Sequence, residues 1–117
     1  MYTAPDGMLG HRRLSIVDVG GGHQPIVDVT GRRAIVANGE IYNAAELRSV
    51  LDATHEFASR SDSEVALHLH TDQGAAAAKQ LDGMFAIAVA EDERVLLMRD
   101  PVGIKPLYIG SYDDGTV

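Results

Sequence analysis

Apolar and polar positions alternate in blocks that predict strands towards both ends of the chain and helices between them. Residues 8–17 form a short segment with β-strand character. The apolar runs 25–29 and 34–37 flank a four-residue polar turn, which predicts a hairpin. The run 34–37 contains no polar residue, so this strand should be covered on both faces of its sheet.

Two helices are predicted in the middle of the chain. Asn43 should begin the first, because Glu46 follows at the spacing of a capping box and apolar residues then recur with helical period. Ser61 and Glu64 repeat the capping-box spacing and should begin the second helix. Gly74 is placed to end it as a C-terminal cap.

The second half of the chain returns to strands. Residues 75–81 predict a shorter helix or turn, and the apolar runs 84–90 and 95–98 predict a second hairpin around a solvated acidic tip at 91–93. Residues 107–109 should begin a further strand. This order of strands, helices and strands predicts an α+β sandwich, and a βαβ parallel fold is not expected.

Composition and charge narrow the possible functions of the 117 residues. Seventeen acidic and 10 basic residues give a formal net charge of −7, which disfavours nucleic acid as a partner. There is no cysteine, which excludes a disulfide, a cysteine-ligated metal and a thiol nucleophile within these residues. The longest apolar run, seven residues at 84–90, is too short to cross a membrane, and no signal peptide is visible; we expect a cytoplasmic protein.

No metal site is expected from the histidines. His68 and His70 are the only close pair, and on a helix their side chains would project about 200° apart, so they could not share an ion. We expect both to be solvated.

Three polar groups interrupt apolar segments, and each has two interpretations. Arg12 and Arg13 could be surface residues, or one of them could clamp a carboxylate through two parallel hydrogen bonds. Asn38-Gly39 could be a hairpin turn, or its amide groups could stabilise an oxyanion. Asp62 could simply favour the start of a helix, or it could bind an ammonium group.

The polar groups belong to a series of longer strings. In chain order these are HRRLSIVD (11–18), GHQP (22–25), NGEIYN (38–43), SDSE (61–64), LDGMFA (81–86) and RDPVGIKPLY (99–108). Together they resemble the glutaminase domain of glutamine-hydrolysing asparagine synthetases, a class II glutamine amidotransferase of the N-terminal-nucleophile hydrolase type. The resemblance covers nearly the whole chain from Gly7, and residues 38–43 are its most specific part.

The resemblance implies a pocket for L-glutamine. Arg13 would hold the α-carboxylate of the substrate, and the same side of the pocket would be lined by Leu14, Ser15, Ile16 and Val17.

At the other positions the resemblance implies roles in catalysis and in binding the amino group. Asn38 and Gly39 would form the oxyanion hole for amide hydrolysis, and Glu40 and Asp62 would bind the α-ammonium group. A carboxylate clamp at one end and acidic partners at the other suit a zwitterionic amino acid. The functional interpretation of all three polar groups therefore agrees with the resemblance.

The fold implied by the resemblance is an αββα sandwich of antiparallel sheets flanked by helices. Residues 1–117 would be a single partial type-2 glutamine amidotransferase domain, incomplete at the N-terminus and the C-terminus. The segment 99–108 would be architectural and place Leu107 and Tyr108 in the sandwich. The family nucleophile is an N-terminal cysteine, which is absent here, so we expect that the chain alone does not hydrolyse glutamine.

The parent activity implied is release of ammonia from glutamine for ATP-dependent amidation of aspartate. L-glutamine and a synthetase domain would be the partners, with neither nucleic acid nor membrane involved. No cofactor is expected in this chain, because ATP and Mg²⁺ would bind in the synthetase domain. The alternatives are a degenerate, non-catalytic amino-acid-binding or interaction remnant, or the glutaminase domain of another class II amidotransferase.

Overall fold

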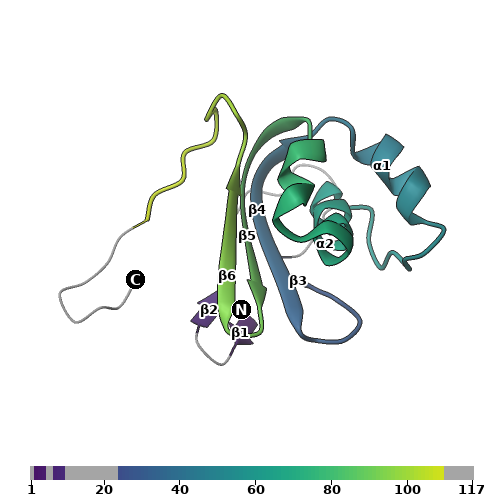
Figure 1. Cartoon of the computed structure of the whole chain (residues 1–117), viewed down its shortest axis with the longest axis horizontal. Coiled ribbons are helices and arrows are strands. Elements are labelled where there is room, and N and C mark those ends of the chain that lie inside the picture. The colour runs from purple at the N-terminus through teal and green to yellow at the C-terminus, as the bar shows by residue number, and fades with distance from the viewer. Residues whose placement is uncertain (1, 5–6, 10–23, 110–117) are drawn as a thin grey trace.

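A four-stranded antiparallel sheet is the centre of the molecule (Figure 1). The computed structural model describes residues 2–4, 7–9 and 24–109. The strands lie in the order β3-β4-β5-β6, with bounds β3 Ile26–Val27, β4 Arg33–Ile41, β5 Gly83–Glu91 and β6 Arg94–Arg99. Both predicted hairpins, β3–β4 and β5–β6, are confirmed, and β4 pairs with β5 between them.

A second, two-stranded sheet is formed by β1, Tyr2–Ala4, and β2, Gly7–Leu9. Strand β2 lies against β4 and β5, and Figure 1 shows this small sheet on the side away from the helices. The predicted β-type segment at residues 8–17 is described only as far as Leu9, and its remainder lies outside the described residues.

The helices pack on one face of the four-stranded sheet (Figure 1). They are α1 at Ala44–Leu51, α2 at Asp62–Gln73 and a 3₁₀ helix, η1, at Gly74–Gln80. The α+β class with antiparallel sheets flanked by helices is therefore confirmed. None of the helices in the described ranges is long and apolar enough to cross a bilayer.

The core lies between the sheet and α2. Alternate residues of β4 and β5, including Ile35, Phe85 and Ile87, face the helices because successive side chains on a strand point to opposite faces. The opposite face carries small residues, among them Ala34 and Ala90, which are also buried. The prediction that residues 34–37 are covered on both faces is confirmed, although Val36 is only partly buried.

The helix ends follow the local sequence in part. Ser61 caps α2, since its hydroxyl accepts the Ser63 N–H at 3.2 Å, and Gly74 ends the helix with φ +61°. Asn43 precedes α1 as predicted, but the capping box with Glu46 is wrong, because no side-chain bond caps this helix. The Asn43 side chain instead ties the start of α1 to the end of η1, through Gln80 O at 2.8 Å and the N–H of Asp82 at 2.9 Å.

The second predicted capping box is also replaced by longer-range contacts. Glu64 does not return to the N–H of Ser61; it accepts the backbone N–H groups of Ala58 and Ser59, each at 2.8 Å. The loop that precedes α2 therefore wraps back on the first turns of the helix.

The structure decides between the two interpretations of Asn38-Gly39: it is not a turn, because β4 runs through it to Ile41 and pairs with β5 throughout. One strand-level expectation is wrong. Residues 107–109 are not a strand, since no described strand lies alongside them. Leu107 is half-buried, but Tyr108 is 89% exposed, so the prediction that it packs in the sandwich is wrong for the described structure.

The two helix histidines are buried, which corrects the expectation that they are solvated. His68 stacks on His55 with ring centroids 4.5 Å apart, and its Nε2 lies 3.4 Å from Glu64. The Nε2 of His70 lies 3.0 Å from Glu91. Most of α2 is buried around its whole circumference, so residues on opposite sides of the helix are both covered.

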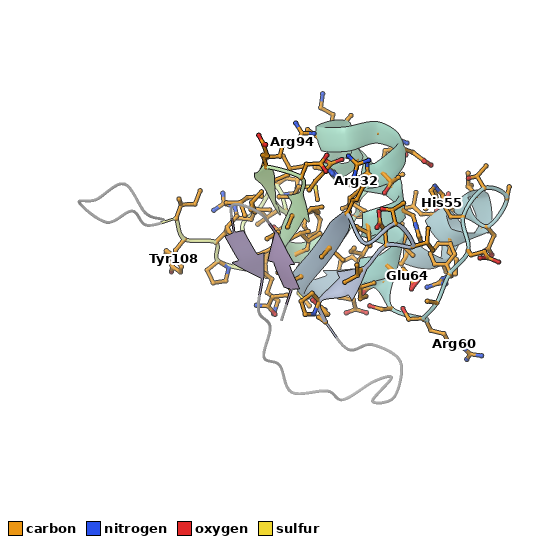
Figure 2. All side chains as sticks on the ribbon, turned by 90° about the horizontal axis from the view of Figure 1, so that it is seen from below. Arg32, His55, Arg60, Glu64, Arg94 and Tyr108 are labelled. Atoms are coloured by element: carbon orange, nitrogen blue, oxygen red, sulfur yellow. The ribbon has the colours of Figure 1, made fainter. Side chains whose placement is uncertain are left out.

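An ionic cluster joins the end of the sheet to α2, and Figure 2 labels one of its members, Arg94. Glu91 accepts from Arg33 Nε at 2.7 Å, and it also contacts Arg94 and His70, so it is not the solvated tip residue that the sequence suggested. Arg33 additionally contacts Asp28 at 3.4 Å. Burial raises the pKa of Glu91, but the hydrogen bonds from His70 and the two arginines outweigh it and lower the pKa to about 2.

This lowered pKa predicts a loss of stability in acid. Since the folded pKa of about 2 lies below the ordinary value of 4.5, the contribution of Glu91 is complete above about pH 4.5 and disappears as the pH falls towards 2. Glu91→Gln should lower the free energy of unfolding at pH 7 and flatten its dependence on pH between 4.5 and 2. Urea unfolding monitored by circular dichroism across this range measures both effects.

The matched control for this prediction is Asp92→Asn, because Asp92 pairs with Arg32 at the exposed tip of the same hairpin. An exposed ion pair contributes little to stability, so this variant should keep the acid dependence of the wild type. Identical pH profiles for Glu91→Gln and the wild type would contradict the assignment.

Candidate functional site

The candidate site is the open edge of β4. Strand β3 pairs with β4 only as far as Ile35, so no described strand covers this side of β4 from residue 36 to Ile41. Side-chain oxygen atoms from residues outside β4 bind the backbone at this edge instead. The N–H of Ala37 donates to Gln24 Oε1 at 2.6 Å, and the N–H of Ile41 donates to Asp62 Oδ2 at 2.8 Å.

The N–H of Gly39 points to the same edge, between those two. Its partner on β5 is Phe85, whose N–H and C=O both bond to Asp100 on the far side of the strand, at 3.1 and 3.0 Å. The Gly39–Phe85 pair is therefore not hydrogen-bonded, and in such a pair both backbones direct their polar groups outwards. Within the described ranges nothing accepts the N–H of Gly39.

Only glycine fits at position 39. Its φ is +125°, and a Cβ there would lie 2.9 Å from Cα of Phe85 and still closer to the carbonyl oxygen of Met84. The neighbouring Asn38 is exposed, and its side chain has no hydrogen-bond partner among the described residues. A free backbone N–H beside a free side-chain amide can stabilise a developing oxyanion.

Two carboxylates flank these donors. Glu40 follows Gly39 and is exposed. Asp62 is the first residue of α2 and is half-buried; its Oδ2 is held by Ile41, while Oδ1 has no partner within the described structure. The positive end of the α2 dipole favours a negative charge at Asp62. Asp62 thus presents one carboxylate oxygen at this edge, and Glu40 adds a negative charge on the residue of β4 that precedes Ile41.

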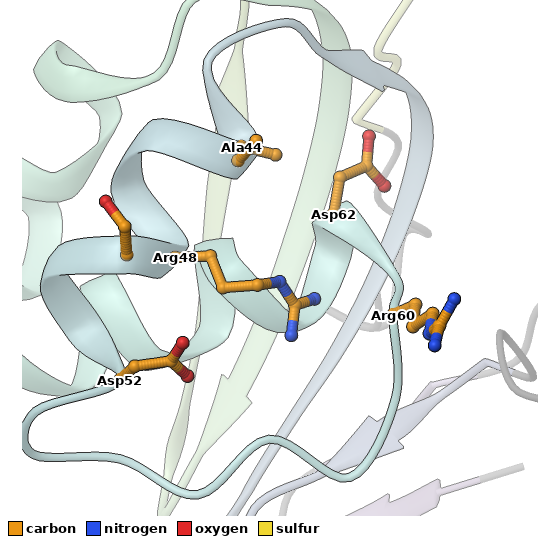
Figure 3. A pocket seen from close by; sticks show the side chains of 7 residues that line it. Ala44, Arg48, Asp52, Arg60 and Asp62 are labelled. Atoms are coloured by element: carbon orange, nitrogen blue, oxygen red, sulfur yellow. The ribbon is translucent and has the colours of Figure 1, made fainter.

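A hollow of about 400 Å³ lies between α1 and the start of α2, with Asp62 at its wall (Figure 3). It is lined by Ala44, Ala45, Arg48, Ser49, Asp52, Arg60 and Asp62. Arg48 is engaged, because its guanidinium donates to the carbonyl groups of Ser59 and Ser61 and lies 4.1 Å from the ring of Phe57. The hollow shares only Asp62 with the β4 edge, so we place the candidate site at the edge, where the free donors and carboxylates meet.

The structure brings together the predicted residues that it describes. Asn38, Gly39 and Glu40 are consecutive on β4, and Asp62 is bonded to the next residue of that strand. The residues predicted for the carboxylate side of the pocket, Arg13, Leu14, Ser15, Ile16 and Val17, lie outside the described residues. All of these roles remain predictions, because no bound substrate tests them.

Asp100 lies on the side of β5 that faces away from β4 and supports the site from there. No individual role was predicted for it from the sequence. It is 2% exposed and accepts the N–H groups of Phe85, Gly103 and Ile104. Burial raises its pKa, but these backbone hydrogen bonds outweigh burial and lower the pKa overall. Asp100 thus fixes Phe85, the residue opposite Gly39; the signal for it was the turn-forming sequence Asp-Pro-Val-Gly at 100–103.

A metal centre finds no support in the described part of the chain. No group of three or more His, Asp or Glu side chains there is arranged to hold an ion.

Comparison with known proteins places the chain among amidotransferases. A family model described as a glutamine amidotransferase domain matches residues 1–117. A probable glutamine-hydrolysing asparagine synthetase of Dictyostelium discoideum is 42% identical over 121 aligned residues, which is 100% of this chain and 22% of that protein. Asparagine synthetase B of Escherichia coli K12 is 40% identical, covering 97% of this chain and 21% of that protein.

The structural comparison agrees. Glutamine phosphoribosylpyrophosphate amidotransferase from B. subtilis superposes with a TM-score of 0.67 and 27% identity, over 78% of this chain and 23% of that chain. This chain spans about a fifth of the length of the curated relatives that it matches. Since the family model covers every residue, the chain belongs to the glutamine amidotransferase domain family.

Proposed function

We propose that the chain binds L-glutamine at the open edge of β4 and contributes the oxyanion site for hydrolysis of the side-chain amide. The observation that carries the proposal is the N–H of Gly39, which no described group accepts and which lies on β4 between Asn38 and the Ile41 N–H that Asp62 accepts. Donors for the amide oxygen and acceptors for the ammonium group are thus combined at one edge.

Each of these residues would have a distinct role in binding or hydrolysis. Asn38 and Gly39 would donate to the amide oxygen as it becomes negative in the tetrahedral intermediate. Glu40 and the free oxygen of Asp62 would accept from the α-ammonium group, and Arg13 would hold the α-carboxylate. The 117 residues contain no cysteine, so the attacking thiol implied by the family resemblance is not among them.

The larger reaction is also part of the proposal. The relatives named as glutamine-hydrolysing asparagine synthetases are 40–43% identical, against 27% for the phosphoribosylpyrophosphate amidotransferase. This difference favours ammonia delivery for amidation of aspartate over the other amidotransferase reactions. ATP and Mg²⁺ would bind in a synthetase domain, and the described residues offer no metal site of their own.

Calorimetry with L-glutamine tests the proposal at both ends of the substrate. Arg13→Ala and Glu40→Gln should each weaken binding about tenfold or more, because each removes a charge-assisted hydrogen bond. Glu40→Gln should not weaken the binding of glutaramate, which lacks the α-amino group. Each titration reports a dissociation constant directly.

Matched controls come from neighbouring charges. Arg12→Ala removes the adjacent arginine, and Glu93→Gln changes an exposed glutamate at the tip of the β5–β6 hairpin. Both should bind L-glutamine as the wild type does. A wild-type chain that does not bind L-glutamine, or an equal loss in Arg12→Ala and Arg13→Ala, would contradict the proposed site.

A further inference from the structure

Gln24 occupies the point where the pairing of β3 with β4 stops. The pairing of β3 with β4 extends as far as Ile26, opposite Ile35, and Pro25 and Gln24 precede Ile26 in the chain. The N–H of Ala37 would belong to the next hydrogen-bonded pair, opposite Gln24. It donates instead to the side-chain oxygen of Gln24 at 2.6 Å, so a side chain continues the pairing of the strand.

The other end of the same amide reaches α2. Gln24 Nε2 donates to the hydroxyl of Ser63 at 3.3 Å. Ser63 is 3% exposed and lies in the first turn of α2, next to Asp62. One side chain therefore joins the edge of β4 to the start of α2, and a primary amide suits this task because it carries both an acceptor and donors.

The two links to α2 lie on either side of Gly39. Gln24 joins Ala37 to Ser63, and Asp62 accepts the N–H of Ile41, so both run from the same helix turn to the same strand edge. The free N–H of Gly39 lies between them. These two links hold the first turn of α2 at one position along β4 and at one distance from that strand.

We propose that Gln24 is a positioning residue, which holds the carboxylate of Asp62 in register with the donors of Asn38 and Gly39. The inference rests on the proposed glutamine site, and it assigns a role to a residue outside the set proposed to bind the substrate. Without Gln24, the hydrogen bond from the Ala37 N–H to the side-chain oxygen is lost, and Asp62 becomes the remaining described side-chain link between β4 and the first turn of α2.

The test compares Gln24→Leu, Gln24→Glu and a destabilised control in the full 117-residue chain. Leucine removes both hydrogen bonds, whereas glutamate can accept from the Ala37 N–H and from the hydroxyl of Ser63. The control is Leu96→Ala, a truncation of a partly buried β6 side chain remote from the edge, used at a temperature that equalises the unfolded fraction. Amide hydrogen exchange by NMR and calorimetry with L-glutamine are the two readouts.

We expect Gln24→Leu to speed exchange at the amides of Ala37 and Ile41 and to weaken L-glutamine binding about tenfold or more, as the loss of buried hydrogen bonds implies. Gln24→Glu should restore protection at Ala37, and Leu96→Ala should bind L-glutamine as the wild type does. Unchanged exchange at Ala37 in Gln24→Leu would overturn the inference. Equal binding by Gln24→Leu and Leu96→Ala would overturn it as well.

Failure of the proposed function gives a different result. A wild-type chain that shows no heat of binding and no L-glutamine-induced shift at Gly39 would reject the glutamine site itself. Amide exchange would then decide the role of Gln24 without the ligand. Faster exchange at both Ala37 and Ile41 in Gln24→Leu alone would support the link to α2, and exchange equal to that of Leu96→Ala would reject it.

Discussion

Replacing Gly39 by alanine should destabilise the fold by about 3 kcal/mol or more. The added Cβ would meet the backbone of β5 at Met84 and Phe85, which cannot move away without opening the β4–β5 ladder. The φ of +125° adds strain, because residues with a side chain rarely adopt it. Urea unfolding followed by circular dichroism measures the loss.

Gly31→Ala is the matched control for Gly39→Ala. Gly31 also has a positive φ, +75°, but a Cβ there would meet nothing within 4 Å. This variant should therefore show only the conformational cost, about 1 kcal/mol. Equal losses for the two variants would show that the close approach of β5 does not constrain position 39.

Replacing Glu64 by alanine should destabilise the chain by about 3 kcal/mol. Glu64 is 2% exposed, and its carboxylate accepts the backbone N–H groups of Ala58 and Ser59 together with the Ser59 hydroxyl, each at 2.8 Å. Removing it leaves these donors without an acceptor and releases the loop that carries Phe57 onto the core. The measurement is the free energy of unfolding in urea at pH 7.

Two further variants separate this loop contact from a general effect of charge. Glu46→Ala removes an exposed glutamate from the first turn of α1 and should change stability by about 0.5 kcal/mol or less. Glu64→Gln keeps one acceptor oxygen and should fall between the wild type and Glu64→Ala. A loss for Glu64→Ala no larger than that for Glu46→Ala would contradict the role of Glu64 in holding the loop.

Features that depend on a few neighbouring residues were predicted well from the sequence. Ser61 and Gly74 cap α2 as expected, because caps are made by side chains and backbone angles within one turn. The two hairpins follow from apolar runs on either side of polar turns. The capping boxes were wrong for the opposite reason: Asn43 and Glu64 found partners in η1 and in the loop at residues 58–59, which local spacing cannot show.

Where the local sequence was compatible with more than one structure, the neighbouring strands and loops decided which structure formed. Asn38-Gly39 favours a turn by its local sequence, and the pairing of β5 with β4 made it extended instead. His68 and His70 project from different sides of α2, and both became buried because the loop with His55 covers one side and Glu91 lies at the other. Neither outcome depends on residues within one helical turn.

The sequence by itself determined the order of the strands and helices, the family, and the residue types of the candidate site. These follow from periodicity, caps and motifs, whose information lies within short stretches of chain. Only the tertiary structure decided that no described strand pairs with β4 at Gly39, that Asp62 binds the N–H of Ile41, and that Gln24 joins β4 to α2. Each of these depends on hydrogen bonds between residues distant in sequence, which form only when β4 and α2 pack together.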